Sequence, residues 1–517
     1  MMSSANMITI VVVAVYMIGM LVIGKIAEKK TKGSADDYLV AGRNMPLWMV
    51  TATLFATWWG GETVMGASGA ALEGGIMDTL YDPWGCGAAL IVAGLFYMKV
   101  CRDMKLRSMG SFYIHRFGHT TGLISSYALI PGYVLWLAVQ ILAIGKVFQV
   151  VLGLPIIVTT IIGAAVIIFY TYSGGILAVA WTDFVQMLLI LIGLFFLMPI
   201  SISKAGGWDV IRSYEPEGFW QIIPSMGDWE TWLWWIAVMI SMTFGNIPGP
   251  DLMQRSFIAK DSETAKKCGV IAGGMYWIFG LLPVAAALCF NALVGEGVIS
   301  AADAAMVAED SELVIPMLAR AVMNPFFAAI FTAALLAAIM SSADSSLFAT
   351  ASIMANDLYP YYYKKKHNQQ AEDSKIYTAS RLAVLFTGIA AVIITFFANS
   401  LYQLLIFSIV YIWHMLFFPF TLGIYWKKCN SYGATAGMVV GLILLLVGCF
   451  TQGTAEPEPE WFWTLFPAVF SGLAVVVVSL LTQKINPPLP LTSEDNEIVK
   501  WPELAVNLPA SFLKKEA

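Results

Sequence analysis

Charged residues are scarce in this sequence. Asp, Glu, Lys and Arg together make up 12% of the 517 residues, whereas hydrophobic residues reach 59%. A soluble domain has about 25% charged residues, so this composition excludes a water-soluble enzyme and a disordered or collagen-like chain. The net charge of −5 provides no basic surface for nucleic acid. The composition predicts an all-α polytopic membrane protein whose first partner is the lipid bilayer.

Cysteine motifs, metal-binding clusters and nucleophile–base pairs are also missing from the sequence. The six cysteines are scattered, mostly in or beside apolar runs, so we expect them to be small core residues. The N-terminus lacks the positive segment of a secretory signal, and we expect residues 7–26 to be a retained first span. The tail 484–517 is too short for a catalytic domain. We therefore do not expect an enzyme.

Apolar runs predict thirteen membrane spans, since one crossing takes about 20 apolar residues. The runs are 7–26, 47–74, 84–100, 121–150, 154–172, 175–199, 230–250, 267–295, 324–352, 378–398, 402–426, 432–451 and 461–483. An odd number of spans places the two ends of the chain on opposite sides of the membrane.

The loops between these spans alternate in charge. Basic residues follow spans 1, 3, 7, 9 and 11, and they are Lys29, Lys30, Lys32, Arg102, Lys105, Arg107, Arg116, Arg255, Lys260, Lys266, Lys267, Lys364, Lys365, Lys366, Lys427 and Lys428. The opposite loops are acidic and hold Asp78, Asp82, Glu215, Glu217, Asp228, Glu230, Asp303, Glu309, Asp310, Glu312, Glu456, Glu458 and Glu460. Only four of the 29 Lys and Arg residues lie on the acidic side, namely Lys146, Lys204, Arg212 and Arg320. The positive-inside rule predicts an integral plasma (inner) membrane protein with its N-terminus outside and its C-terminus in the cytoplasm.

Two of the predicted spans contain residues that break a helix. Span 2 carries Trp59-Gly60-Gly61-Glu62, and span 7 ends with Gly-Asn-Ile-Pro-Gly-Pro-Asp at 245–251. Either break alone is explained equally well as a simple kink, but breaks five spans apart are expected from two inverted repeats. The predicted parts are the first helix and cytoplasmic loop (1–46), the first repeat (47–199), the second repeat (230–426), two peripheral helices (427–483) and a cytoplasmic tail (484–517).

Span 9 contains an unusual polar segment, Ala-Ala-Ile-Met-Ser-Ser-Ala-Asp-Ser-Ser at 337–346. Helical spacing places hydroxyl groups and the Asp344 carboxylate on adjoining faces. A hard cation such as Na⁺ takes several oxygen ligands, which unwound carbonyls from span 2 would complete. Serines that merely allow close helix packing are the alternative, but they do not explain Asp344, because a carboxylate inside a membrane is costly.

Other polar and aromatic residues allow two interpretations each. Asp183, at the start of span 6, is either a site residue or an interfacial helix cap. His414 fits a hydrogen-bonded core position better than a proton relay. Trp58, Trp59 and Trp136 would form a cation–π wall for an organic ammonium, although packing explains any one tryptophan.

These segments resemble the sodium:solute symporter family over residues 37–450. Further pieces that carry the resemblance are 37–43 (Asp-Tyr-Leu-Val-Ala-Gly-Arg), Gly174-Gly175, 180–183 (Ala-Trp-Thr-Asp), Gln186 and 433–437 (Gly-Ala-Thr-Ala-Gly). The resemblance implies thirteen helices with an inverted-repeat core similar to the leucine-transporter fold. It also implies Na⁺ as the coupling ion, with no other metal.

The resemblance implies two ion sites. The first is a sodium site formed by the carbonyls of Ala56, Trp59 and Ala338 and the hydroxyls of Ser341 and Ser342. The second, known in some members, would use Asp183 and Ser345, with Asp344 where those members have a hydroxyl. This second site would hold Na⁺, a proton or nothing.

Within the family, segment 340–346 and segment 245–248 with Gln254-Arg255 look closest to the high-affinity choline transporters. Those members use an aromatic cage, and the resemblance implies solute contacts at Trp58, Trp136, Glu62 and Gly249. Gly249 stands where a cage tryptophan would be expected, and Glu62 is a further departure. The residues favour a cation or zwitterion, although a carboxylate, sugar or urea-like solute stays open.

The function expected from the sequence is sodium-coupled secondary active symport of a small polar solute by alternating access. A membrane sensor or receptor that uses the same fold is the alternative from another class. Accumulation of solute against a gradient distinguishes the two. A channel is third, because nothing in the sequence forms a filter ring.

Overall fold

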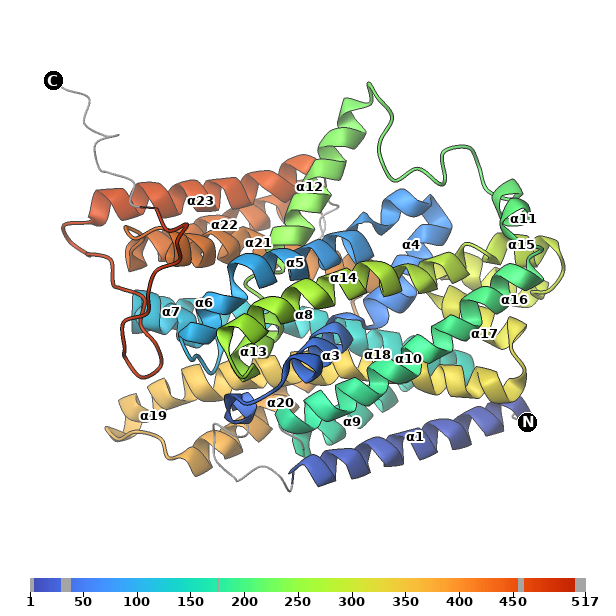
Figure 1. Ribbon diagram of the computed structural model, residues 1–517, viewed down its shortest axis with the longest axis horizontal. Coiled ribbons are helices and arrows are strands. Elements are labelled where there is room, and N and C mark those ends of the chain that lie inside the picture. The colour runs from blue at the N-terminus through green and yellow to red at the C-terminus, as the bar shows by residue number, and fades with distance from the viewer. Residues whose placement is uncertain (1–3, 29–38, 174–175, 399, 454–459, 507–517) are drawn as a thin grey trace.

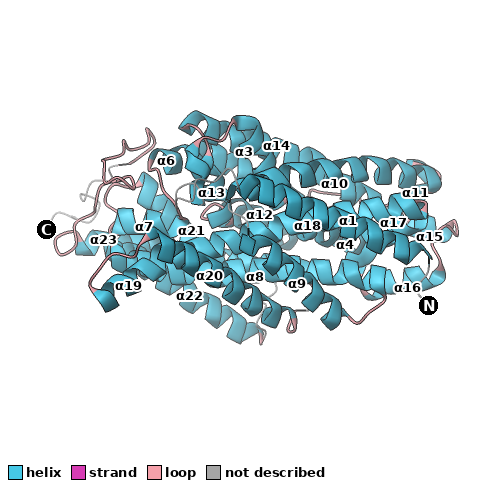
Figure 2. Cartoon of the chain, turned by 90° about the horizontal axis from the view of Figure 1, so that it is seen from below, coloured by secondary structure: helices cyan, strands magenta, loops and turns pink. Residues whose placement is uncertain are grey.

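The computed structural model describes residues 4–28, 39–173, 176–398, 400–453 and 460–506. Most of these residues are helical, and the long helices run side by side along the long axis of the molecule (Figures 1 and 2). Pairing between extended segments is limited, in the described ranges, to three isolated bridges. The predicted all-α class is confirmed. Several residues used in the sequence analysis lie outside the described ranges: Lys29, Lys30, Lys32, Asp37, Tyr38, Gly174, Gly175, Glu456 and Glu458.

The helices follow the predicted apolar runs. In the first half they are α1 (Ser4–Glu28), α3 (Leu47–Trp58), α4 (Ala67–Gly74), α5 (Cys86–Phe96), α6 (Met98–Asp103), α7 (Met109–Phe117), α8 (His119–Leu152), α9 (Ile156–Ser173), α10 (Ile176–Lys204) and α11 (Trp208–Ser213). In the second half they are α12 (Trp229–Gly245), α13 (Pro250–Ile258), α14 (Ser262–Ala287), α15 (Phe290–Gly295), α16 (Ala301–Glu309), α17 (Val314–Val322), α18 (Pro325–Ser352), α19 (Tyr359–His367), α20 (Asp373–Thr395), α21 (Leu401–Tyr425), α22 (Ser431–Gln452) and α23 (Trp461–Thr482). Short 3₁₀ and π segments join some of them: η1 (Ala41–Arg43), η2 (Glu62–Gly66), η3 (Ile76–Leu80), η4 (Tyr81–Gly85), η5 (Ser311–Leu313) and η6 (Ile353–Leu358).

Many of these helices have the length and composition of membrane spans. Among the described residues, nine helical segments are long and apolar enough to cross a bilayer. Three shorter apolar helices, Met7–Met20, Leu47–Trp58 and Ile156–Phe169, accompany them. The polytopic membrane class is therefore supported, while the count of thirteen crossings stays a prediction.

Helix α18 forms the centre of the bundle. All of its residues from 333 to 352 are buried, and it packs against α1, α3, α8, α10 and α20. A helix buried on every side needs no amphipathic pattern, which is why small and polar residues can occupy its whole circumference. The outer helices instead expose large apolar side chains, as a lipid-facing surface requires. Examples are Val15, Ile18, Phe169, Phe196, Phe386, Phe450 and Leu481.

Both predicted helix breaks are present. Helix α3 ends at Trp58, Trp59 leaves the helical region with φ −96° and ψ 67°, and the chain resumes in η2. Helix α12 ends at Gly245, and α13 begins at Pro250, where a missing N–H costs no helical hydrogen bond. Both broken helices lie in the interior of the bundle. Helix α3 is buried from Met49 to Trp58, and α13 is buried along its whole length.

The cysteines behave as expected. Cys86, Cys101, Cys268, Cys289 and Cys429 are buried, Cys449 is partly buried, and all six are free thiols. They serve as small apolar side chains in helix packing.

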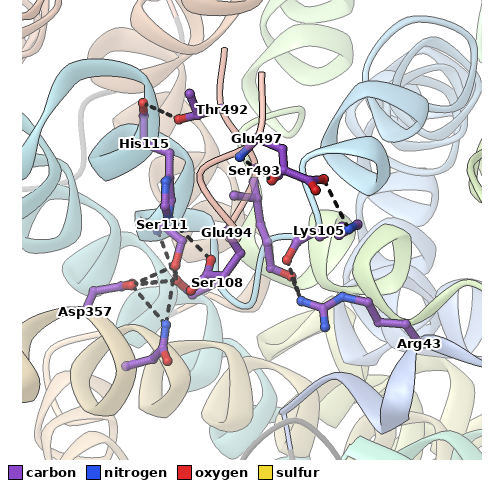
Figure 3. Close-up of polar contacts among 12 residues, drawn as sticks. Arg43, Lys105, Ser108, Ser111, His115, Asp357, Thr492, Ser493, Glu494 and Glu497 are labelled. Atoms are coloured by element: carbon purple, nitrogen blue, oxygen red, sulfur yellow. Dashed lines mark hydrogen bonds and ion pairs between the residues drawn. The ribbon is translucent and has the colours of Figure 1, made fainter. Parts of the chain in front are cut away.

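At one end of the bundle, near α6, α7 and α19, polar contacts join segments that are distant in sequence (Figure 3). The Asp357 carboxylate accepts hydrogen bonds from the hydroxyls of Ser108 at 2.7 Å and Ser111 at 3.1 Å. Met45 N–H donates to the carbonyl of Ile258 at 3.1 Å, and Lys260 N–H donates to the carbonyl of Met45 at 3.0 Å. These contacts hold the start of α3 against the end of α13 and close this end of the structure.

Residues 484–506, here called the C-terminal strap, cover the same end. Glu494 N–H donates to the carbonyl of Met104 at 2.9 Å, and Thr492 Oγ1 donates to the carbonyl of His115 at 3.2 Å (Figure 3). Lys105 Nζ lies 2.9 Å from the Asp495 carboxylate. The strap therefore binds both flanks of α7.

Arg116 in α7 anchors the strap. Its guanidinium donates to the carbonyls of Gly423 at 2.7 Å, Cys429 at 2.9 Å and Leu489 at 2.6 Å. The Trp501 ring lies 5.2 Å from the guanidinium carbon. Burial lowers the pKa of Arg116 to about 10, which leaves the side chain charged at neutral pH. One buried cation thus joins α7, the connection between α21 and α22, and the strap.

We predict that Arg116→Met lowers the melting temperature of the purified protein. The substitution keeps an apolar stem but leaves several buried carbonyls without a donor, which costs about 2–4 kcal/mol. Lys105→Met is the control, because the Lys105 ion pairs are exposed and its loss leaves the melting temperature nearly unchanged. Thermal unfolding in detergent measures both, and equal melting of the two variants would contradict the anchoring role.

Candidate ion and solute site

The break after α3 lies directly against α18. A Cβ atom at Gly60 would stand 2.4 Å from Ser342 Oγ, so only glycine lets these backbones approach. Ser342 is fully buried, and its hydroxyl makes no hydrogen bond within the described part of the chain. The last bond of the α3 ladder runs from Trp59 N–H to the carbonyl of Phe55, and the Trp58 carbonyl accepts from the Tyr276 hydroxyl at 2.7 Å. The Ser342 hydroxyl, without a partner among the described residues, therefore lies against the broken end of α3.

The residues predicted for the first sodium site lie on these two elements. Ala56 and Trp59 are buried at the end of α3, and Ala338 is buried on α18 one turn before Ser342. Ser341 differs from Ser342, because its hydroxyl donates to the Asp183 carboxylate at 2.6 Å. The arrangement supplies oxygen ligands of the type that hard cations prefer.

Asp183 lies in the interior of α10 and is fully buried. It accepts hydrogen bonds from Ser341, from Thr53 on α3, and from Arg255 at 3.5 Å. The alternative reading of Asp183 as an interfacial helix cap is wrong, because the carboxylate joins three other helices at the centre of the bundle.

The Arg255 guanidinium occupies the region predicted for the second ion. Its Nη2 atom donates to Ser345 Oγ at 2.6 Å and to Thr57 Oγ1 at 2.6 Å. Arg255 is fully buried on α13. Two of the ligands predicted for the second site, Asp183 and Ser345, therefore already contact a fixed cation that the sequence analysis had counted as a loop charge.

Asp344 completes this cluster. It is fully buried and interacts electrostatically with Asp183 and Arg255. Neither of its carboxylate oxygens receives a hydrogen bond of ordinary geometry from the described residues. Buried charges are almost always paired, so two carboxylates around one guanidinium need either a further cation or a proton.

A narrow cavity with a volume of about 30 Å³ lies beside the break. Trp58, Glu62 and Trp136, three of the predicted solute residues, line it together with Asp82, Tyr133 and Asp251. All six side chains are buried.

Each carboxylate in this cavity accepts hydrogen bonds. Trp136 Nε1 and Gln140 Nε2 donate to Glu62 at 3.2 and 2.5 Å. Trp58 Nε1 donates to Asp251 at 2.5 Å, and the Tyr133 hydroxyl donates to its other oxygen.

The Asp82 carboxylate also accepts hydrogen bonds, but on one of its two oxygens. One oxygen accepts from Thr63 at 2.8 Å and from Tyr276 at 3.0 Å. Its Oδ1 atom has no partner among the described residues. The prediction that Asp82 is a solvated loop charge is wrong, because the residue is fully buried in the cavity wall.

Gly249, the fourth predicted solute residue, lies at the start of α13, behind this wall. A Cβ atom there would stand 2.7 Å from the Tyr133 hydroxyl and 3.0 Å from an Asp251 oxygen. The space for a larger side chain is taken by this Tyr133–Asp251 pair, so Gly249 shapes the cavity without lining it. Asp251 directly follows the prolines that break span 7, and this position is the sequence signal that could have identified it.

A larger cavity, with a volume of about 830 Å³, lies toward the end of the bundle where α4 and α16 are found. Residues 402, 403 and 406 of α21 line this cavity, and residues 405, 408, 409 and 412 line the smaller one. Tyr81 and Tyr402 line the larger cavity, with ring centroids 5.8 Å apart.

Lys146 lines the larger cavity and is buried against acidic residues. Its Nζ atom lies 2.7 Å from an Asp310 oxygen and also contacts Glu312. Glu312 in turn accepts from the Tyr402 backbone N–H at 3.0 Å. The charge pattern of the sequence predicts Lys146, Asp310 and Glu312 on the acidic loop side, whereas Lys146 and Glu312 are buried parts of the cavity wall.

His414 is a buried residue of α21, and its Nε2 atom lies 3.1 Å from the carbonyl of Thr464. This geometry agrees with the hydrogen-bonded core position expected from the sequence.

Inward-facing oxygens at a broken helix, beside an enclosed polar cavity in an all-helical membrane bundle, define an ion-coupled solute transporter. The chain belongs to the sodium:solute symporter family, whose model matches residues 38–441. It is therefore a sodium-coupled secondary transporter and not an enzyme, with Na⁺ as its coupling ion.

Relatives and a solved structure agree with this assignment. The chain is 27% identical to the high-affinity choline transporter 1 of Caenorhabditis elegans, with 93% of this chain and 86% of the relative covered. It is 26% identical to the osmoregulated proline transporter OpuE of Bacillus subtilis, with 92% and 95% covered. The fold is similar to that of a Na⁺-coupled sialic acid symporter in a substrate-bound, outward-open state, with a TM-score of 0.74 at 21% identity and 92% and 98% covered. Solved neighbours support the expected similarity to the leucine-transporter fold.

We predict that Gly60→Ala strongly reduces the stabilisation of the protein by Na⁺. The added methyl group would approach Ser342 Oγ to 2.4 Å and Gln140 and Glu62 oxygens to 2.7 Å, so the break must move away from α18. Gly274→Ala on α14 is the matched control, because a Cβ there meets nothing within 4 Å. Melting temperatures with and without Na⁺ measure the effect. A normal Na⁺ response in Gly60→Ala would show that the break does not form the ion site.

Proposed function

We propose that this protein couples the inward flow of Na⁺ to the uptake of a small organic cation. The observation that carries the proposal is the solute cavity, which is lined by three buried carboxylates and by no basic side chain among the described residues. Trp58, Trp136 and Tyr133 add aromatic faces that attract cations. A buried site with this charge favours a positively charged solute over a neutral or anionic one.

The wider cavity supports the same choice of solute. Glu73, Asp78, Glu309, Asp310 and Glu312 line it, with Lys146 as the single basic side chain among its described lining residues. A cleft with excess negative charge raises the local concentration of cations and speeds their entry. Choline, the solute named for one group of relatives, is a suitable first probe.

We assign the coupling Na⁺ to the oxygens between α3 and α18. The ligands are the carbonyls of Ala56, Trp59 and Ala338 and the hydroxyls of Ser341 and Ser342. The free hydroxyl of Ser342 and its contact with the Gly60 position support this assignment. Bound Na⁺ would hold the α3 break against α18 and thereby favour the solute-binding state.

We assign the second predicted ion site, formed by Asp183, Asp344 and Ser345, a different role. Arg255 supplies one fixed positive charge there, and two carboxylates surround it. When both carboxylates are charged, the cluster attracts Na⁺ to the adjacent site; otherwise it holds one proton.

The proposed topology has thirteen membrane helices, an external N-terminus and a cytoplasmic C-terminus. Residues 47–199 and 230–426 form two inverted repeats that rock around the central site. In this orientation the larger cavity opens outward, and the contacts around Met45 and the C-terminal strap close the cytoplasmic side. The structure then corresponds to an outward-facing state.

We predict that Ser342→Ala raises the Na⁺ concentration needed for half-maximal uptake by about tenfold, because one ligand oxygen is lost. Ser346→Ala is the matched control on α18, since its buried hydroxyl bonds only to its own helix at Ala343. Uptake of labelled choline into proteoliposomes over a series of Na⁺ concentrations measures the change. If Ser341→Ala and Ser342→Ala both leave uptake intact, or if removal of Na⁺ has no effect, the assigned sodium site is wrong.

We predict that Asp344→Asn also weakens Na⁺ binding, while the shape of the side chain is kept. The substitution removes the uncompensated charge next to the sodium ligands, so the attraction for a cation falls. Titration of the Na⁺-dependent melting temperature at neutral pH tests this. An unchanged titration would mean that Asp344 is already neutral in the wild-type protein.

A further inference from the structure

The wall of the solute cavity has a carboxylate at each end and an aromatic pair between them. Glu62 accepts from Trp136 Nε1 at 3.2 Å, and Asp251 accepts from the Tyr133 hydroxyl. The Tyr133 and Trp136 rings contact each other edge to face, with centroids 5.6 Å apart. The two carboxylates are thus each bonded to a different ring of this pair.

Both carboxylates accept hydrogen bonds on each oxygen. Glu62 accepts from two N–H donors, and Asp251 accepts from one N–H and one O–H donor. Such donors stabilise a carboxylate anion and offset part of the cost of burying it.

Asp82 adds a third acidic group, near Glu62. The two side chains interact electrostatically, and Asp82 Oδ1 is buried in the cavity wall without a partner among the described residues. A buried acceptor without a donor is costly, and a solute N–H group would satisfy it. The Glu62 end of the cavity therefore offers a strong position for an ammonium group.

Arg255 interacts electrostatically with Asp251 but forms no ion pair with the cavity acids among the described residues. It approaches Asp251 through the backbone carbonyl at 3.5 Å, and its closest side-chain contacts are Thr57 and Ser345 at 2.6 Å. The same guanidinium already balances Asp183. The negative charge that faces the cavity is left for the solute.

The remaining wall is apolar. Leu405, Ile409 and Ile412 of α21 line the cavity along with the aromatic rings. Such a surface suits methylene groups and gives no partner to a carboxylate or to several hydroxyls.

We propose that the solute is an aliphatic diamine, with one ammonium group between Glu62 and Asp82, the other at Asp251, and a short methylene chain along the Tyr133–Trp136 pair. This inference rests on the proposed function, because it specifies the kind of cation that the same cavity binds. A quaternary monocation leaves one end unpaired, and an amino acid brings its carboxylate against three acids. Two separated positive charges match the two ends of the cavity.

Binding of matched amines to the purified full-length protein tests the proposal. The probes are 1,4-diaminobutane, n-butylamine with the same chain and one amine, choline, and proline, each measured by thermal stabilisation with and without Na⁺. We expect 1,4-diaminobutane to bind at least about tenfold more tightly than n-butylamine in Na⁺. Diamines with longer or shorter chains should bind more weakly than the diamine whose chain length fits the cavity.

The failures of the two proposals are distinguishable. If n-butylamine or choline binds as tightly as every diamine, the diamine assignment is wrong, while a cation transporter remains. If proline binds and none of the amines does, the cation proposal itself is wrong.

Substitutions at the far end of the cavity give a second test. Asp251→Asn should abolish the advantage of 1,4-diaminobutane over n-butylamine, because only the Glu62 end still pairs with an ammonium. Asp209→Asn, at an exposed position on α11, is the control and should keep the wild-type ratio. If Asp251→Asn does not fold, Tyr133→Phe replaces it, since it removes one donor to Asp251 and should lower the ratio in part. An unchanged ratio in a folded variant would overturn the proposal.

Discussion

The buried guanidinium of Arg255 is the contact on which the centre of this structure depends. It belongs to α13 and donates to Thr57 of α3 and Ser345 of α18, and it lies 3.5 Å from Asp183 of α10. A guanidinium in an apolar interior is stable only when several acceptors surround it. The four helices are therefore fixed relative to one another by the requirement to satisfy a single charge. Asp183 extends this network toward the sodium site, because it also accepts a hydrogen bond from Ser341.

Local chemistry in the sequence was sufficient for the helices and for both breaks. Glycine pairs and prolines act on their own backbone, so Gly60 and Pro248 identify broken helices without knowledge of any partner. Ser342 and Asp344 were found for a similar reason, since polar groups in an apolar helix are costly wherever the helix packs. The all-α membrane class and the family resemblance followed from the same kind of pattern.

The sequence could not separate buried charges from loop charges. Asp82, Arg255 and Glu312 lie near the ends of apolar runs, where a charge is equally compatible with solvent or with a buried partner. Their partners are distant in the chain: Glu312 pairs with Lys146, 166 positions away, and Arg255 bonds to Thr57, 198 positions away. Such pairings depend on tertiary packing, which periodicity and charge alternation do not encode. The positive-inside pattern therefore predicted an orientation but misplaced the residues that build the cavity walls.

Gln140 of α8 connects the two halves of the central site. Its side-chain oxygen accepts from Gly61 N–H at 3.1 Å, while its nitrogen donates to Glu62 at 2.5 Å. The same amide thus fixes the broken backbone beside Ser342 and orients a carboxylate in the solute cavity. One consequence concerns how such a protein diversifies. A lineage that acquires a new solute by reshaping the Glu62 end also disturbs the backbone that holds the ion, so solute preference and sodium affinity are inherited as a linked pair.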